Sequence, residues 1–516
     1  MKYEGVKVKY KGSILRRGVL AGAVVLAGGS AASLAASPAG ASNTQMTAVG
    51  SFTTFFMMHA LFPQLNDINP NPETGSGSQS IAADSQTCSG GLTYNTTTQP
   101  PNGSGQGKTA LAGEETAAAT SQGCIDFSRS SSPPAPHSET LPSGSTESGD
   151  PAASHLDYYA YALDGVAPLV GSDAPSTVRT AGSDTGPKNG LTLAQVQGIY
   201  ACTITNWDQI TVNGQTGVNA PIVTFWPQSG SGTRAVYTDV LGFDPTVPGT
   251  APDTCTTTTQ PITSFTLSGV TAPNEENAED GILYQNTIGD ANTSPSTPAG
   301  SVAAAAIYIY SAGKFSQEWN DTADNNSTAP NFVDTTLTGN SANTLGNFLA
   351  GTLSMATMQS TTGVGEAYAD LTPQVGRFNQ DTNRGTYAVD GGTVAEQNEW
   401  YHNLPNNSGN PSDSAATIPG IRYVYNVADT VLPGYNGAKM MVGFDNQTSG
   451  TKSVLCNGDD ATTIVAQGFL PLSTGGSAPA GSDAAAATCR QFQGLSYPGK
   501  GAVIHWTTPT FDGRSS

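Results

Sequence analysis

The chain has 516 residues, with 20 lysine and arginine residues against 40 aspartate and glutamate residues, which gives a formal net charge of −20 at pH 7. This charge makes nucleic acid and anionic membrane surfaces unfavourable partners. It does not exclude an anionic ligand, because charges more than about 10 Å away are screened by salt while oriented N–H groups act at contact range. The length allows two domains.

The first 41 residues have the pattern of a secretory signal peptide. Basic residues open the segment, an apolar run follows at 19–26, and small residues at 39–41 suit cleavage before Ser42. The apolar run is too short to span a bilayer, so we expect no transmembrane helix. We expect an extracytoplasmic protein without a lipid anchor, since the first cysteine is Cys88. Two arginines at 16 and 17 leave the twin-arginine route open beside general secretion.

Strand and helix patterns alternate in the first part of the mature chain. In order, the predicted elements are a strand at 46–49, a helix capped by Thr53 and running to Phe62, a helix at 108–119 and a short buried strand at 125–127. Polar segments at 66–106 and 130–153 are rich in Gly, Ser and Pro, which indicates loops.

The alternation continues beyond these loops. The next predicted elements are an extended apolar segment at 158–170, a helix at 191–200, a strand at 221–226, a second extended segment at 302–310, a strand at 421–427 and a helix at 461–468. Residues 313–415 show no legible pattern. Strands that alternate with helices predict a parallel-sheet α/β architecture.

A glycine-rich turn, Ser229 to Arg234, runs directly into an amphipathic helical pattern. Helix starts carry unpaired N–H groups and partial positive charge, glycines let an anion approach, and Arg234 adds a cation. The turn therefore suits an oxyanion. A plain helix cap is the alternative interpretation of this turn.

Six cysteines in an exported chain indicate disulfides. Neighbouring pairs are favoured among the fifteen pairings, namely Cys88–Cys124, Cys202–Cys255 and Cys456–Cys489. A metal site is the alternative, but C-x-x-C spacing is absent from the sequence and its five histidines are scattered singly. We therefore expect neither a metal nor a cofactor.

Enzyme motifs do not fit the sequence. Ser231 is not preceded by the glycine that a nucleophile elbow requires. Gly107-Lys108-Thr109 has the ending of a phosphate-binding P-loop, but Asn102 stands where that motif has a glycine. We expect a protein without catalytic residues.

Seven segments together resemble the PstS-type phosphate-binding receptors of ABC transporters, in particular a secreted actinobacterial branch. In the family's order they are Val49 to Thr54, Pro101 to Gly107, Cys124 to Ser130, Tyr161 to Val166, Leu191-Thr192 with Ile199 to Trp207, Pro227 to Arg234 and Gly468 to Leu472. The resemblance implies a two-lobed, periplasmic-binding-protein-like (type II) α/β fold with phosphate between the lobes.

The two long apolar segments, 158–170 and 302–310, suit the two hinge segments that cross between such lobes. Residues 42–160 and 306–516 would then form lobe 1, the second part with insertions, and residues 161–305 would form lobe 2. The N-terminal and C-terminal parts should pack on each other.

The resemblance also implies a ligand set of hydroxyls, backbone groups, one carboxylate and one guanidinium. Its members are Thr53, Thr54, Ser104, Asp126, Ser128, Ser231, Gly232, Thr233 and Arg234. Asp126 would accept a hydrogen bond from a protonated oxyanion and repel sulfate. Pro227 replaces an arginine found in some relatives, so Arg234 would supply the cation alone.

Each of these residues also has a purely structural interpretation. Thr53 could serve only as a helix cap, Ser104 could belong to a surface turn, and Asp126 could pair with Arg129.

Two functions remain open on this basis. The first is a monomeric receptor that delivers inorganic phosphate to an ABC transporter permease. The alternative is a secreted protein on the same fold with a surface-interaction or phosphatase-like role.

Overall fold

The computed structural model describes most of residues 46–315 and, beyond them, residues 353–356, 421–432 and parts of 455–493, with the longest internal gaps at 69–78, 133–154 and 180–189. The expected signal peptide, the region from 316 to 352 and from 357 to 415, the Cys456–Cys489 pair and most of the expected helix at 461–468 lie outside the described residues.

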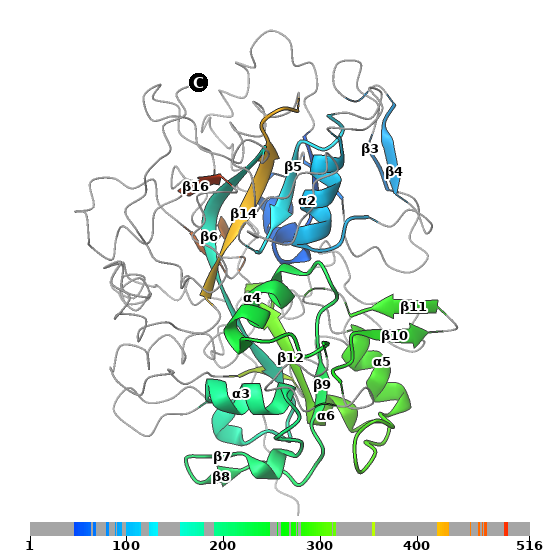
Figure 1. Ribbon diagram of the computed structural model, residues 1–516, viewed down its shortest axis with the longest axis vertical. Helices are drawn as coiled ribbons and strands as arrows, with labels where there is room; N and C mark the ends of the chain where they lie inside the picture. Colours follow the sequence, from blue (N-terminus) through cyan, green and yellow to red (C-terminus); the bar gives the residue numbers. More distant parts are fainter. Residues whose placement is uncertain are drawn as a thin grey trace, which may run out of the picture. The chain divides into compact units, whose positions relative to one another are not determined.

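One mixed sheet organises the described chain (Figure 1). Its strands follow the order β2 (Asn66–Asp67), β1 (Thr47–Gly50), β5 (Phe127–Ser130), β14 (Ile421–Asp429), β6 (Leu156–Val170), β12 (Ala306–Ser311) and β9 (Val223–Phe225). Three short strands also pair with β6: β13 (Ser354–Met355), β15 (Leu470–Pro471) and β16 (Arg490–Gln493).

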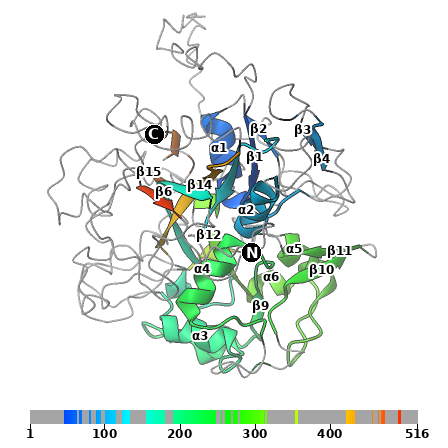
Figure 2. The same cartoon turned by 45° about the horizontal axis from the view of Figure 1, so that its top comes forward.

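The alternation of strands and helices predicts a parallel sheet, and this prediction is wrong for part of the sheet. β1 is parallel to β2 and β5, and β12 is parallel to β9, but β14 runs antiparallel to both of its neighbours and β12 antiparallel to β6. Because β14 lies between β5 and β6, residues of the C-terminal part share one sheet with the N-terminal part (Figure 2).

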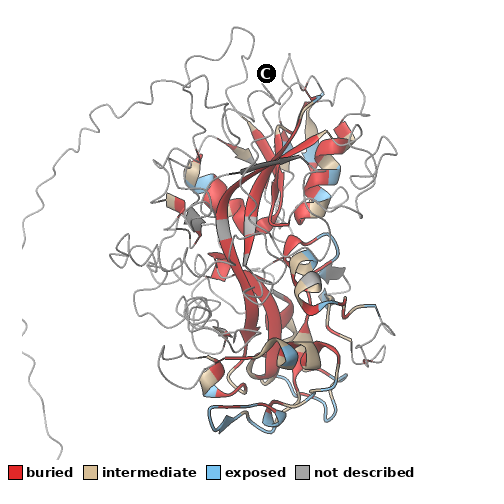
Figure 3. Cartoon of the chain, turned by 60° about the vertical axis from the view of Figure 1, so that its left-hand side comes forward, coloured by how far each residue is buried: buried red, intermediate tan, exposed pale blue. Residues whose placement is uncertain are grey.

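The long strand β6 belongs to two hydrophobic cores. Leu156 and Tyr158 to Ala162 pack in the first core, with strands β1, β5 and β14. Val166, Ala167, Leu169 and Val170 pack in the second core, with β9 and β12. Figure 3 shows β6 as an almost continuously buried ribbon through both regions. Most of its 15 residues are hydrophobic, as expected for a strand that is covered on both faces, and Asp157 and Asp164 are the acidic exceptions.

Two helices cover the first core. α1 (Phe55–Leu61) follows a short 3-10 turn, η1 (Phe52–Thr54), and buries Met57 and Met58. α2 (Ser104–Gly113) begins four residues before the predicted start, because Gly103 adopts a φ of 99° that ends the preceding loop.

Helices of the second core include α3 (Leu193–Tyr200), α4 (Gly232–Leu241) and α5 (Asp280–Ile288). Thr192 and Gln195 form a capping box on α3, and Ser231 caps α4. The predicted extended segment at 302–310 is wrong in its first part. Val302–Ala305 forms the short helix α6 before β12 starts.

Three antiparallel hairpins extend from the sheet. They are β3 (Gln79–Ile81) with β4 (Leu92–Tyr94), β7 (Thr211–Val212) with β8 (Gln215–Thr216), and β10 (Ser264–Leu267) with β11 (Val270–Pro273).

Two disulfides confirm the pairing of neighbouring cysteines. Cys88–Cys124 and Cys202–Cys255 are both formed, with Cα atoms 4.6 and 5.1 Å apart. The loops that they close have separations of 36 and 53 residues, for which the chain-entropy model gives about 3–4 kcal/mol of stabilisation each.

Among the described residues, no helix combines the length and the apolar character needed to cross a membrane.

Candidate functional site

Polar side chains gather where two parallel strands end and two helices begin. Ser51 follows β1, and Ser131 follows β5. The carboxyl ends of parallel strands meet at the same edge of a sheet, so these serines lie close, with their Oγ atoms 3.0 Å apart. Ser104, the first residue of α2, accepts a hydrogen bond from the backbone N–H of Ser131 at 2.8 Å.

Helix α4 adds its N-terminus to this group. A Cβ atom added to Gly232 would collide with the hydroxyls of Ser104 and Ser131, so only glycine lets α4 approach this closely. The backbone N–H groups of Gly232 and Thr233 are consequently turned to the same point as the serine hydroxyls. The positive end of the helix dipole therefore faces the cluster.

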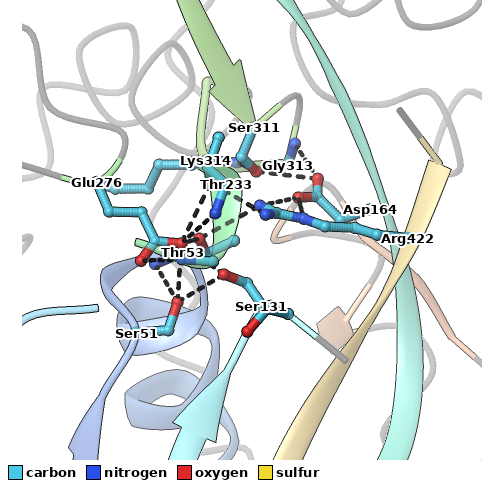
Figure 4. Close-up of polar contacts among 12 residues, drawn as sticks. Ser51, Thr53, Ser131, Asp164, Thr233, Glu276, Ser311, Gly313, Lys314 and Arg422 are labelled. Carbon is cyan, nitrogen blue, oxygen red and sulfur yellow. Dashed lines mark hydrogen bonds and ion pairs between the residues drawn. The ribbon is translucent and has the colours of Figure 1, made fainter. Parts of the chain in front are cut away.

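The carboxylate of Glu276 occupies the centre of the cluster (Figure 4). One of its oxygens, Oε1, accepts hydrogen bonds from the hydroxyls of Ser51, Thr53, Ser131 and Thr233 and from the backbone N–H of Thr233. The Thr53 bond is 2.7 Å long, and the Gly232 N–H reaches the other oxygen at 3.4 Å. Glu276 is completely buried.

These donors outnumber the acceptor sites. A carboxylate oxygen offers about two lone pairs. Five donor groups converge on Oε1 alone. The cluster can therefore satisfy an anion with more oxygens than a carboxylate has.

A buried ion pair stands beside the cluster. Arg422 on β14 donates from Nη2 and Nε to Oδ2 of Asp164 on β6, at 2.8 and 3.0 Å. The other guanidinium nitrogen donates to the hydroxyl of Thr233 at 3.0 Å, and Nη2 also reaches the hydroxyl of Thr53 at 3.4 Å. Arg422 thus connects the ion pair to two of the groups that hold Glu276.

Asp164 has its acceptors filled from three elements. Its Oδ1 accepts from the Ser311 hydroxyl at 2.9 Å and from the Gly313 N–H at 3.1 Å, while Oδ2 takes Arg422. Both members of the pair are at most 1 % exposed. A carboxylate with this many donors is fixed in place, and it fixes the guanidinium in turn.

Two further buried cations lie around the cluster. Lys314 Nζ is 4.4 Å from the ring centroids of both Phe52 and Phe56, and Figure 4 shows Lys314 in the same group as Glu276. The Arg129 guanidinium donates to the carbonyls of Gly50 and Ser51. Burial lowers the pKa of Arg129 to about 9, although Tyr161 and Glu276 counteract this shift.

Several predicted ligands are present in the cluster. The structure brings together Thr53, Ser104, Gly232 and Thr233, which lie up to 180 positions apart in the sequence. Ser231 is the N-cap of α4, where its hydroxyl accepts from the Arg234 N–H at 3.1 Å. As a cap, Ser231 stabilises the helix start that faces the cluster, but its hydroxyl is bonded within that helix turn.

Asp126 is not brought to this cluster. Its carboxylate accepts the Thr47 N–H at 2.7 Å, at the beginning of β1, whereas the cluster follows the other ends of β1 and β5. The alternative of a pair with Arg129 does not explain it either, because Arg129 donates to the backbone carbonyls of Gly50 and Ser51, at the far end of β1 from Asp126.

Arg234 also points elsewhere. Its guanidinium forms an ion pair with Asp244 at 2.8 Å and donates to the Pro227 carbonyl at 3.3 Å and to the Thr246 hydroxyl. Arg422, rather than Arg234, is the arginine that donates to the Thr53 and Thr233 hydroxyls of the cluster.

Two predicted hydroxyl ligands are buried beside the cluster rather than in it. The Ser128 hydroxyl donates to the Arg129 carbonyl at 3.2 Å. Thr54 is completely buried.

Sequence reasoning missed most of the charged groups, namely Asp164, Glu276, Lys314 and Arg422, together with Ser51 and Ser131. Asp164 and Ser51 stood inside segments already singled out by resemblance. Arg422 could have been noticed as an arginine within a strand of apolar and aromatic residues. Glu276 carries no local signal, because it follows a polar segment that contains other acidic residues.

The sheet, the two cores that share β6 and the cluster of donors define an α/β protein with a fold like that of periplasmic binding proteins. Residues 73–281 match the model of the PBP superfamily domain. The match spans less than half of the chain, and the cluster includes residues on both sides of it.

Solved structures of phosphate receptors resemble the chain at low identity. An ABC-type phosphate transport receptor from Vibrio cholerae is 14% identical, with 82% of this chain and 99% of that chain covered and a TM-score of 0.32. A putative phosphate ABC transporter substrate-binding protein with bound phosphate from Clostridium perfringens is 12% identical, with 83% and 100% covered and a TM-score of 0.30.

A phosphate-binding protein from Stenotrophomonas maltophilia is 17% identical, with 84% of this chain and 91% of that chain covered and a TM-score of 0.31. With TM-scores below 0.5, these similarities do not indicate a ligand or a role for this chain. No curated protein matches the chain at a comparable level of significance.

Proposed function

We propose that the cluster is the binding site for inorganic phosphate and that the chain is an extracytoplasmic phosphate receptor, with binding rather than catalysis as its task. The observation that carries the proposal is the convergence of five donor groups on one oxygen of Glu276. A tetrahedral oxyanion presents acceptors in several directions and matches such a set of hydroxyls and helix N–H groups better than a carboxylate does.

The charges around the cluster support the same ligand. Among the described residues, the buried charged groups at the cluster are three cations and two anions: Arg129, Lys314 and Arg422, and Asp164 and Glu276. With Glu276 counted in, the excess is one positive charge; without it, the excess is two. A doubly charged phosphate ion would therefore be compensated in a setting where an uncompensated buried charge costs several kcal/mol, in order of magnitude.

We name inorganic phosphate rather than another oxyanion because the sequence resembles that of phosphate receptors. We extend the proposal to delivery of phosphate to an ABC transporter permease, with the chain acting as a monomer outside the cytoplasm.

Titration calorimetry of the full chain with phosphate tests the proposal, with arsenate as a second tetrahedral oxyanion and chloride as a small monoanion. Phosphate and arsenate are expected to bind at one ion per chain, and chloride should give no saturable signal. If neither oxyanion binds to the chain or to a Glu276→Ala variant, the proposal fails.

Two variants locate the site. The double variant Asp164→Asn/Arg422→Met removes the guanidinium without leaving a lone buried carboxylate, and should weaken phosphate binding about tenfold to a hundredfold, the effect of losing a charged hydrogen bond. Arg234→Ala is the matched control, since that arginine pairs with Asp244, and it should change the dissociation constant less than about threefold. The reverse order of effects would restore Arg234 as the ligand.

A further inference from the structure

We propose that Glu276 is an internal competitor that occupies the anion site until a doubly charged oxyanion displaces it. The inference rests on the proposed function and adds its regulation. Glu276 lies between β11 and α5, in the second half of the fold, while Ser51, Thr53 and Ser131 belong to the strand ends of the first half.

The competition follows from the contacts themselves. Glu276 already uses the hydroxyls of Ser51, Thr53, Ser131 and Thr233 and the N–H groups of Gly232 and Thr233. A second anion in contact with this buried carboxylate would be strongly repelled. An oxyanion can therefore use the donors only when the carboxylate has left them.

The displacement has a fixed anchor and a movable end. Asn274, two residues before Glu276, is buried, and its backbone N–H donates to the Thr263 carbonyl at 2.7 Å while its carbonyl accepts from Gln228 at 2.8 Å. The glutamate side chain has rotatable bonds beyond its own Cα, so rotation can withdraw the carboxylate while Asn274 stays in place.

The charge balance selects the ligand that can compete. Arg129 interacts electrostatically with Glu276, Arg422 donates to the Thr53 and Thr233 hydroxyls that hold its carboxylate, and Lys314 lies in the same group of residues. Asp164 is the other acidic group beside the cluster. An ion with two negative charges gains more from these three cations than the single carboxylate that it replaces. A singly charged ion gains no more than Glu276 does and also has to pay for its own desolvation. The site should thus prefer dianionic tetrahedral oxyanions.

Glu276 also links the two halves of the fold. Its oxygens connect Ser51, Thr53 and Ser131 to the start of α4 in the same way that a bound anion would.

Calorimetric titration with inorganic phosphate tests the inference on the full chain and on Glu276→Ala. The variant removes the competing carboxylate, so we expect at least tenfold tighter binding together with a lower melting temperature in the absence of phosphate. Asp208→Asn is the charge control, because Asp208 is exposed and its replacement removes one negative charge, as Glu276→Ala does. It should leave both quantities unchanged.

A second readout uses acetate as a probe that resembles the missing carboxylate. Acetate should raise the melting temperature of Glu276→Ala and weaken its phosphate binding, but have no effect on the unaltered chain. Glu276→Gln should lie between the two proteins in phosphate affinity, since its amide keeps one acceptor oxygen.

The outcomes separate the inference from the proposed function. Equal phosphate affinity in the unaltered chain and in Glu276→Ala overturns the inference and leaves the function. Weaker binding in Glu276→Ala also overturns it, because Glu276 would then be a ligand group. Absence of phosphate binding in both proteins overturns the function and the inference together.

Discussion

Asp164 and Arg422 are direct register partners on the antiparallel strands β6 and β14, and two guanidinium nitrogens of Arg422 donate to the same carboxylate oxygen. Strand pairing thus determines where the guanidinium stands, and Asp164 holds it toward Thr233 and Thr53. Asp164 is a positioning residue: it acts on the proposed anion site through Arg422.

The first prediction concerns the stability of this pair. Arg422→Met leaves Asp164 buried without its partner and should lower the free energy of unfolding by about 3–5 kcal/mol. Asp164→Asn/Arg422→Met removes both charges and should cost much less than the single variant. Urea unfolding of the four proteins of the double-mutant cycle measures the difference. Additive losses would mean that the two side chains are not coupled.

The second prediction concerns the close approach of α4. The methyl group of Gly232→Ala should displace the hydroxyls of Ser104 and Ser131 and weaken phosphate binding by about tenfold or more, as expected when donors in a binding cluster lose their alignment. Calorimetric titration measures the change.

Gly242→Ala is the control at the other end of the same helix. Gly242 has a φ of 81°, and an added Cβ has nothing within 4 Å. The substitution should cost about 1–2 kcal/mol of stability through the left-handed backbone while phosphate affinity stays the same. Loss of affinity in this variant would show that the Gly232→Ala effect is not local.

The third prediction concerns the pH dependence of stability. Burial raises the pKa of Glu114 to about 8, assisted by Asp126 and opposed by backbone N–H groups including that of Ile125. The folded state therefore binds this proton more tightly than the unfolded chain does. The contribution to stability is complete below the ordinary pKa of a glutamate and is lost as pH rises through about 8.

Glu114→Gln removes the titration and retains a carbonyl oxygen for the Ile125 N–H. The melting temperature of the unaltered chain should fall relative to that of the variant between pH 5 and pH 9, as measured by calorimetry at fixed ionic strength. A constant difference across this range would contradict the assigned titration.

The local signals in the sequence predicted the donors well but the charged groups poorly. Thr53, Ser104 and Thr233 stand at helix starts, where a hydroxyl next to unpaired N–H groups is visible in a short segment. The prediction for Arg234 is wrong because an arginine in the first turn of a helix can point to either side. Its guanidinium binds Asp244, ten residues further on, and so points away from the cluster. The direction of a side chain depends on neighbours that the segment does not contain.

Features that depend on strand pairing could not be predicted from single segments of the sequence, for a related reason. Asp126 was chosen as the acidic group, yet strand register puts it at the opposite end of β1 and β5 from the donors. Arg422 enters the site through the pairing of β14 with β6, and periodicity within either segment carries no information on that pairing. The α/β character and the buried segment at 158–170 were predictable, since both depend on patterns within one element.

The distance along the chain between Asp164 and Arg422 is 258 residues, and it has a consequence for the order of assembly. Closing a long loop costs entropy before any contact is gained, so such pairings form slowly. Within the sheet, β5 is joined to β6 through β14, so the strands that end at Ser51 and Ser131 connect to β6 only when this C-terminal strand is in place. Arg422 therefore reaches the hydroxyls of Thr53 and Thr233 only once β14 has paired with β6, and a chain without this pairing presents those hydroxyls without that guanidinium.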